Sequence, residues 1–305
     1  MLKKIIFIVG PTAIGKSEAA VYFAKRIGAE IISCDSMQVY KGMDIITSKP
    51  KLTLRKKIKH YLIGTVPLSK DYDVSSYRKD ALKKVKEIIA RGKVPLFVGG
   101  TGLYMSILAD GIFEEDIKDE LIREKLYKLA KNRGSLYLHN QLKKVDFEAS
   151  EKIHPNDTKR IIRALEVFKV TGKPISGLQK KRRGLRDEYE VRIFCLNAGR
   201  DKVYKKIDKR VELMFKAGLI KEVKGLLKKR LSRNASFAIG LREIKGYLNG
   251  DYGLEAAKDM IQLKTRRYAK RQLTWFRKDK KIEWINLKDS DTPTKISRRI
   301  WKKLS

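Results

Sequence analysis

KKIIFIVGPTAIGKS, residues 3–17, decides the fold of this chain. Residues 3–9 are a short apolar run of the kind that forms a buried parallel strand. Residues 10–17 match the pattern G-x-x-x-x-G-K-[ST], and residues 18–27 have the spacing of a helix. A strand, a glycine-rich loop and a helix in this order predict an α/β domain whose loop binds phosphate.

Strands and helices continue to alternate downstream of this unit. Apolar runs predict three more strands, at 30–34, 59–63 and 94–98. Residues 75–91 are amphipathic and predict a helix that Gly92 ends. This order is typical of a parallel sheet with helices on both faces.

The alternation stops after Gly111 and resumes near residue 190. In between, the spacing of apolar residues predicts helices over 116–133, 135–144 and 156–171, followed by a basic loop over 173–187. Beyond it we predict strands at 191–197 and 282–285 and helices over 200–217, 219–229, 237–248 and 254–277. The chain is therefore predicted to be a P-loop NTPase-like α/β core, residues 1–112 and 189–305, with an all-helical insertion domain, residues 113–188.

The charge of the chain is strongly unbalanced. Its 71 Lys and Arg against 35 Asp and Glu give a net charge of +36. Such a charge attracts polyanions, and it favours a nucleic-acid partner over merely solvated basic faces. No run approaches the ~18 apolar residues of a membrane span, and the N-terminus lacks the features of a secretory signal. Two cysteines are too few for a disulfide framework or a zinc site, so we expect a cytoplasmic protein that binds no membrane.

The predicted phosphate site is the loop after the first strand. Its glycines let backbone N–H groups point inward, and the following helix adds positive potential at its N-terminus. Lys16 adds a full charge, and the Ser17 hydroxyl is placed to ligate Mg²⁺. The predicted binding residues are Gly10, Pro11, Thr12, Ala13, Ile14, Gly15, Lys16 and Ser17. The loop alone leaves open whether ATP, GTP or another diphosphate occupies it.

Two other strand ends carry candidate functional residues. Ligands of open α/β sheets bind at the carboxyl ends of the strands, so Asp35, after the second strand, is expected near the phosphate loop. A carboxylate there can act as a general base, and Gln38 offers a donor and an acceptor to a base edge. Gly99-Gly100-Thr101-Gly102 follows the fourth strand, and Thr101 could donate its hydroxyl to a diphosphate oxygen.

Together these motifs resemble the tRNA dimethylallyltransferase family over nearly the whole chain. The segments that carry the resemblance are GPTAIGKS (10–17), DSMQVYKGMDI (35–45), GGTGLY (99–104), HPNDTKRIIRALEVF (154–168), RVELMFKAGLIKEV (210–223) and TRRYAKRQLTWFRKD (265–279). The phosphate loop is shared with many kinases, whereas the combination of the other segments is specific.

The resemblance implies a reaction and roles for named residues. The family uses Mg²⁺ and dimethylallyl diphosphate to modify N6 of the adenosine at position 37 of tRNA, 3′ of the anticodon, in tRNAs that read codons beginning with U. By resemblance, Asp35 is the general base, Thr101 and Arg210 are catalytic residues that bind the diphosphate, and the prenyl diphosphate, not ATP, occupies the loop. The implied contacts to the tRNA anticodon stem-loop are Asp35, Ser36, Met37, Gln38, Thr101, Arg123, Lys159, Arg160, Ile161, Ile162 and Arg163.

Basic helices fit an RNA partner as well. Residues 159–163 and 265–277 place several cations on one helix face, which favours phosphate contacts over solvated surface, while residues 180–183 allow either interpretation. The chain departs from the family at Leu241, where relatives usually have Tyr, and residues 46–50 are slightly off pattern. We expect the protein to act as a monomer.

Two other functions remain open from the residues alone. A P-loop kinase of a small metabolite would share the fold and the loop, but it would not explain the charge of +36. A non-catalytic RNA-binding NTPase would explain the charge, but it would not require Asp35.

Overall fold

The computed structural model describes residues 2–112, 117 and 119–304, which form two compact units. One unit comprises Met1–Ala109 with Glu188–Ser305, and the other comprises Asp110–Asp187. The helix predicted from residue 116 begins at Glu120 in the described part, and residues 113–116 lie outside it.

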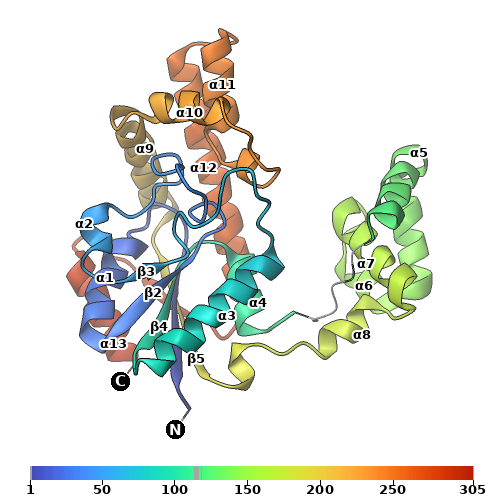
Figure 1. Ribbon diagram of the computed structural model, residues 1–305, viewed down its shortest axis with the longest axis horizontal. Coiled ribbons are helices and arrows are strands. Elements are labelled where there is room, and N and C mark those ends of the chain that lie inside the picture. The colour runs from blue at the N-terminus through green and yellow to red at the C-terminus, as the bar shows by residue number, and fades with distance from the viewer. Residues whose placement is uncertain (1, 113–116, 118, 305) are drawn as a thin grey trace. The chain divides into compact units, whose positions relative to one another are not determined.

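The first unit is built on a sheet whose described strands number six, all parallel, in the order β3-β2-β4-β1-β5-β6 (Figure 1). The strands are β1 (Lys4–Val9), β2 (Ala29–Cys34), β3 (His60–Tyr61), β4 (Val94–Gly99), β5 (Glu190–Asn197) and β6 (Glu283–Asn286). The fold prediction is confirmed, including each predicted strand. β1 lies between β4 and β5, so the loop that follows it opens at the centre of the sheet edge.

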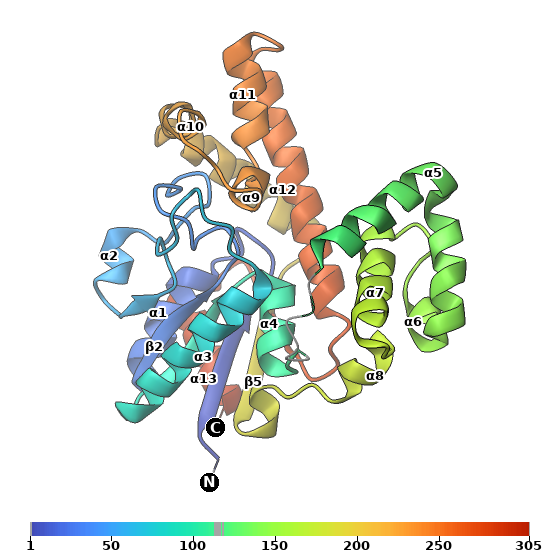
Figure 2. The same ribbon diagram turned by 45° about the vertical axis from the view of Figure 1, so that its right-hand side comes forward.

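Helices cover both faces of this sheet, which is why β1 is buried along nearly its whole length. α1 and α13 pack against each other on one side of the sheet, and α3 and α4 pack together on the other (Figures 1 and 2). The helices of this unit are α1 (Lys16–Ile27), α2 (Leu52–Arg55), α3 (Val74–Ala90), α4 (Gly102–Ala109), α9 (Arg200–Lys216), α10 (Leu219–Leu227), α11 (Leu241–Asn249), α12 (Leu254–Phe276) and α13 (Pro293–Leu304), with a 3-10 turn η2 (Ala235–Phe237).

The second unit is helical throughout its regular elements. These are α5 (Glu120–Val145), α6 (Phe147–Lys152), α7 (Thr158–Thr171), α8 (Ile175–Lys180) and the 3-10 turn η1 (Leu185–Asp187). Gly134, at φ 81°, breaks α5 into two segments, which agrees with the two helices predicted on either side of this residue. Leu126, Leu138 and Leu142 from α5 pack with Ile161 and Leu165 from α7 in its core.

Two of the differences from the sequence prediction have a clear structural cause. Residues 173–187 were predicted to be a loop, but they contain α8 and η1, because Ile175 and Leu178 have an apolar core to pack against. The helix predicted from residue 237 begins instead at Leu241, because Gly240 adopts φ 110° and its backbone N–H donates to the Glu243 carboxylate at 2.8 Å. Among the described residues, no helix is both long and apolar enough to cross a membrane.

Candidate active site

Three adjacent strand ends bring the predicted catalytic segments together. β4 lies between β2 and β1, so the segments that follow these strands share one edge of the sheet. The Thr101 backbone N–H donates to the Cys34 carbonyl at 3.1 Å, and the Ser36 N–H donates to Thr101 Oγ1 at 3.0 Å. Asp35 and Thr101 are thus held side by side, next to the loop that follows β1.

The phosphate loop is tightly bent and holds its lysine inward. Gly10 has φ 142°, and a Cβ there would collide with the Leu196 carbonyl of β5, so this position requires glycine. Lys16 Nζ donates to the carbonyl oxygens of Gly10 at 3.0 Å and Pro11 at 2.7 Å. Burial of the ammonium and repulsion by Arg210 lower the pKa of Lys16 to about 8, although the negative charge of Asp35 opposes them.

Arg210 reaches the same loop from α9. Its Nη1 donates to Thr12 Oγ1 and its Nε donates to Ser48 Oγ, both at 2.7 Å. Burial lowers the pKa of Arg210, and the Asp35 carboxylate raises it. Lys16 and Arg210 are therefore two positive charges that repel each other and are partly shielded from water. A bound polyanion would stabilise both charges.

The Asp35 carboxylate is oriented by its own backbone turn. Oδ1 accepts from the N–H groups of Met37 at 2.9 Å and Gln38 at 3.2 Å. Among the described residues, no hydrogen bond is formed by Oδ2, and Asp35 is only half-buried. One carboxylate oxygen is fixed and the other can accept a proton from a bound group.

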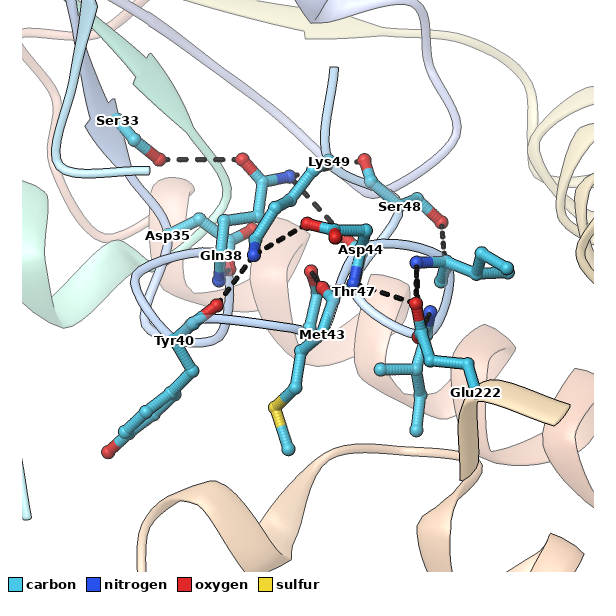
Figure 3. Close-up of polar contacts among 12 residues, drawn as sticks. Ser33, Asp35, Gln38, Tyr40, Met43, Asp44, Thr47, Ser48, Lys49 and Glu222 are labelled. Carbon is cyan, nitrogen blue, oxygen red and sulfur yellow. Dashed lines mark hydrogen bonds and ion pairs between the residues drawn. The ribbon is translucent and has the colours of Figure 1, made fainter. Parts of the chain in front are cut away.

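Gln38, predicted to read a base edge, makes hydrogen bonds within the protein. Its Oε1 accepts from Ser33 Oγ at 3.4 Å, and its Nε2 lies 3.4 Å from the carbonyl oxygens of Thr47 and Ser48 (Figure 3). The side chain thereby links the end of β2 to the segment at 43–49, and both donor and acceptor are already engaged.

One face of α12 carries residues that the sequence interpretation did not assign. Gln272 accepts from the Thr12 N–H at 2.9 Å and donates to the Gly100 carbonyl at 2.8 Å, so its amide joins the phosphate loop to the β4–α4 segment. Tyr268, one turn earlier, lies beside Thr101; burial and the charge of Asp35 raise the pKa of its hydroxyl. Trp275 donates to Ser106 at 3.0 Å. Their i, i+4, i+7 spacing within TRRYAKRQLTWFRKD was the signal that could have identified this face.

The RNA contacts predicted in the second unit fall into different environments. Lys159 and Arg160 are exposed at the start of α7. Ile161 and Ile162 are buried in the core, so their side chains face away from solvent. Arg163 at 3.0 Å and Arg123 at 2.9 Å both pair with Glu166, whose side chain is fully buried. Burial raises the pKa of Glu166, but its hydrogen bonds, foremost with Arg163, lower it further, so the net shift is downward.

Comparison with known proteins places the chain in a family. The sequence profile described as IPP transferase matches residues 38–279. The chain is 43% identical over 302 residues to a tRNA dimethylallyltransferase of Acetivibrio thermocellus, covering 98% of this chain and 96% of the relative. A tRNA dimethylallyltransferase of Geobacter sulfurreducens is 44% identical over 284 residues, with 92% and 91% covered.

Solved structures agree with this relationship. The full-length tRNA isopentenylpyrophosphate transferase of Bacillus halodurans is 39% identical and superposes with a TM-score of 0.73, covering 99% of this chain and 97% of that one. A eukaryotic dimethylallyltransferase, described as acting on tRNA, is 28% identical with a TM-score of 0.82, covering 98% of this chain and 77% of its own. Because the relatives and the profile cover most of the length, the chain belongs to the IPP transferase family.

Proposed function

We propose that the protein transfers a dimethylallyl group from dimethylallyl diphosphate to N6 of adenosine 37 in tRNAs that read codons beginning with U, and that it acts as a monomer. The observation that carries this proposal is the shared site at three adjacent strand ends: Arg210 donates to Thr12 of the loop that holds Lys16, and the segment of Asp35 is hydrogen-bonded to Thr101. A base for the amine thus lies beside a cationic cradle for the leaving diphosphate.

The donor diphosphate is held by the loop 10–17, Arg210 and the Thr101 hydroxyl. Among the described residues there is no cluster of three or more His, Cys, Asp or Glu side chains that could hold a metal ion. The Ser17 hydroxyl at the start of α1 suits Mg²⁺, which commonly keeps water and substrate phosphate oxygens as its other ligands. When bound, the ion would neutralise charge on the leaving diphosphate.

The chemistry needs a base because the N6 lone pair is delocalised into the purine ring. As N6 forms its bond to C1 of the prenyl group, the C1–O bond breaks and the electron pair leaves with the diphosphate. Asp35 Oδ2 takes the proton from N6, a contribution typically worth ~10²–10⁴-fold in rate. Lys16 and Arg210 stabilise the charge that develops on the leaving oxygen.

The tRNA must present its adenosine unstacked, at a cost of a few kcal/mol. Phosphate contacts offset this cost, and the exposed cations that we assign to them are Lys159 and Arg160 on α7 and Arg267, Lys270 and Arg271 on α12. Residues 35–38 and Thr101 would line the entry of the base. RNA contacts by Arg123, Ile161, Ile162 and Arg163 remain predictions; the two arginines would contact RNA only through the parts that their pairing with Glu166 leaves exposed, and the two buried isoleucines only through their backbone.

The decisive experiment is mass spectrometry of tRNA nucleosides after incubation of the protein with unmodified tRNA, dimethylallyl diphosphate and Mg²⁺. We expect N6-(dimethylallyl)adenosine with the wild-type protein. Asp35→Asn keeps an acceptor for the Met37 and Gln38 N–H groups but not the base, so kcat should fall by about 10²–10⁴-fold while tRNA binding persists. Asp251→Asn, an exposed carboxylate between α11 and α12, is the matched control and should behave as wild type.

A kinase would give the opposite pattern. ATP turnover or phosphoryl transfer to a small molecule without RNA, together with unmodified tRNA, would refute the proposed reaction. Full activity of Asp35→Asn would refute the role of the carboxylate while leaving the reaction itself in place.

A further inference from the structure

Glu222 binds a backbone segment far from it in sequence. From the first turns of α10, its Oε2 accepts from the N–H groups of Asp44 at 3.0 Å and Ile45 at 2.9 Å, and its Oε1 accepts from Ile46 at 2.8 Å (Figure 3). Within the described chain, Glu222 has no ion-pair partner among the cations. Its carboxylate is therefore committed to these three amides.

The segment that Glu222 holds, the 43–49 loop, is closed on itself. The Ser48 N–H donates to the Ile45 carbonyl and the Lys49 N–H to the Asp44 carbonyl, both at 2.9 Å, and Thr47 Oγ1 donates to the Met43 carbonyl. Lys49 Nζ also bonds to the Tyr40 carbonyl at 2.6 Å and to Asp44 at 2.8 Å. A loop closed in this way moves as one body, so that fixing residues 44–46 also fixes residue 48.

Ser48 occupies a backbone conformation that its surroundings must maintain. Its φ of 47° lies in the left-handed region, which is unfavourable for a side chain with a Cβ. This conformation presents Ser48 Oγ to Arg210 Nε, while Arg210 Nη1 reaches Thr12 of the phosphate loop. The carbonyl of Ser48 also lies within reach of the Gln38 amide. One small loop thus contacts the arginine of the donor site and the glutamine that follows the catalytic carboxylate.

We propose that Glu222 is a positioning residue that orients Arg210 for the donor diphosphate by way of the 43–49 loop and Ser48. The identification of the ligand as a prenyl diphosphate rests on the proposed function above. A free guanidinium on a flexible side chain samples many rotamers, and holding it in one geometry before binding removes that entropic cost. Arg210 leaves α9 and Glu222 leaves α10, so the helix pair contacts the loop at both of its ends.

The test measures binding of inorganic diphosphate with Mg²⁺ by calorimetry, alongside the KM for dimethylallyl diphosphate, the KM for tRNA, and kcat. The variants are Glu222→Gln, Glu222→Ala, Ser48→Ala, and the double variant Glu222→Gln/Ser48→Ala. Glu212→Gln is the matched control, because within the described part of the chain this α9 carboxylate pairs only with Lys258, at 3.5 Å, and its side chain is 44% exposed.

We expect Ser48→Ala and Glu222→Gln each to weaken diphosphate binding by about tenfold, the size expected when an orienting hydrogen bond to a charged group is lost. Glu222→Ala should weaken it more, because Gln still offers one acceptor oxygen. The KM for tRNA should change much less than the KM for dimethylallyl diphosphate. The double variant should be little worse than either single variant, because both changes interrupt the same connection.

A purely structural role would lower the Tm and leave diphosphate binding at the level of Glu212→Gln, which would overturn the proposal. Fully additive losses in the double variant would also overturn it, since they require two independent routes. If Glu222→Ala fails to fold, Glu222→Gln and Ser48→Ala decide the matter. Calorimetry with diphosphate needs no turnover, so a wild-type protein that does not modify tRNA would contradict the proposed function and still leave this test intact.

Discussion

Within the donor site, the surroundings of Lys16 strongly affect the charge of its ammonium group. It donates to two carbonyl oxygens of its own loop, faces Arg210 and lies within the influence of Asp35. Burial and the arginine reduce its pKa to about 8, so a modest rise in pH changes its charge. A diphosphate would favour the protonated form, and binding and protonation are therefore linked.

The linkage predicts a pH dependence of donor binding. Below pH 8 the lysine is charged and attracts the diphosphate; as the pH rises through about 8 the amine becomes neutral, so affinity falls. We expect the Kd for dimethylallyl diphosphate to rise by up to about tenfold per pH unit above 8, with uptake of up to one proton on binding. Calorimetry in buffers of different ionisation enthalpy measures this uptake. Lys16→Arg, which stays charged, should show a flat profile, and a flat wild-type profile would contradict the linkage.

Individual site residues differed in how far the sequence could reveal them. Asp35, Thr101 and the loop at 10–17 each follow a strand, so the topology of a parallel sheet predicts that they meet. Glu222, Ser48 and Gln272 gave no such signal, because their roles arise from contacts across 162 to 260 residues of sequence. Local spacing can show that Gln272 shares a helix face with Tyr268 and Trp275, but it does not show which loops that face contacts once the sheet and the helices have assembled.

At the scale of elements, α12 acts as a brace: it contacts two loops of the site, the phosphate loop and the segment between β4 and α4, and holds them together. Tyr268, Gln272 and Trp275 lie on one face and contact Thr101, the phosphate loop and Ser106. A Cβ at Gly100 would collide with the Gln272 amide, and one at Gly102 would collide with the Trp275 ring. Gly100, after β4, and Gly102, at the start of α4, therefore allow α12 to approach closely.

This brace predicts the effect of Gln272→Leu. The change removes the acceptor of the Thr12 N–H and the donor to the Gly100 carbonyl, and Gln272 is almost fully buried. One buried and one partly buried backbone group lose their partners, so we expect a loss of about 1–3 kcal/mol in the free energy of unfolding and a higher KM for dimethylallyl diphosphate. Denaturant unfolding and steady-state kinetics measure the two effects. Thr274→Ala, exposed on the same helix, is the control, and equal stability of both variants would argue against the brace.

In the helical unit, the buried carboxylate of Glu166 connects several groups in a comparable way. Because Arg163, Arg123 and the Asp119 N–H share this buried carboxylate, Arg163→Ala should lower the stability of Asp110–Asp187 by about 1–3 kcal/mol, and Arg160→Ala should not. Hydrogen exchange of α5 and α7 amides would distinguish the two variants. Similar protection in both would mean that Arg123 alone satisfies Glu166.

Helices were predictable where their apolar spacing was long and regular, and less so elsewhere. α1, α3, α7, α9, α10 and α12 were all predicted within a few residues of their observed bounds. The short helices α2, α6 and α8 escaped prediction because a single turn or two shows no period. α13 (Pro293–Leu304) was also missed, although its twelve residues have the apolar spacing of a helix. α4 was hidden by the glycines that precede it and by its nearly continuous apolar sequence, which has no polar face.

At the scale of the whole molecule, a net charge of +36 provides a general attraction to RNA, but it does not say where RNA binds. Many cations are already in ion pairs: Arg266 with Asp208 at 2.6 Å, Arg163 with Glu166, Lys180 with Glu148, and Arg160 with Asp157 at 3.3 Å. Of these four cations, Lys180 and Arg160 still keep more than half of their side-chain surface exposed. Only cations that remain exposed and directed to solvent can release counterions from RNA on binding. Within each basic run, the exposure of each cation therefore indicates which residues can contact RNA, and the sequence alone could not make this distinction.

The difference in exposure predicts which basic residues control the salt dependence of tRNA binding. Lys159→Ala/Arg160→Ala removes two exposed cations from α7, so log K for tRNA should fall, and the slope of log K against log salt should become shallower by about 1–2. Filter binding or fluorescence anisotropy over a range of salt concentrations measures the slope. Arg298→Ala/Lys302→Ala, a charge-matched exposed pair on α13, lowers the net charge by the same amount and should leave the slope nearly unchanged. If both pairs changed the slope equally, attraction would follow total charge, and α7 would not contact tRNA.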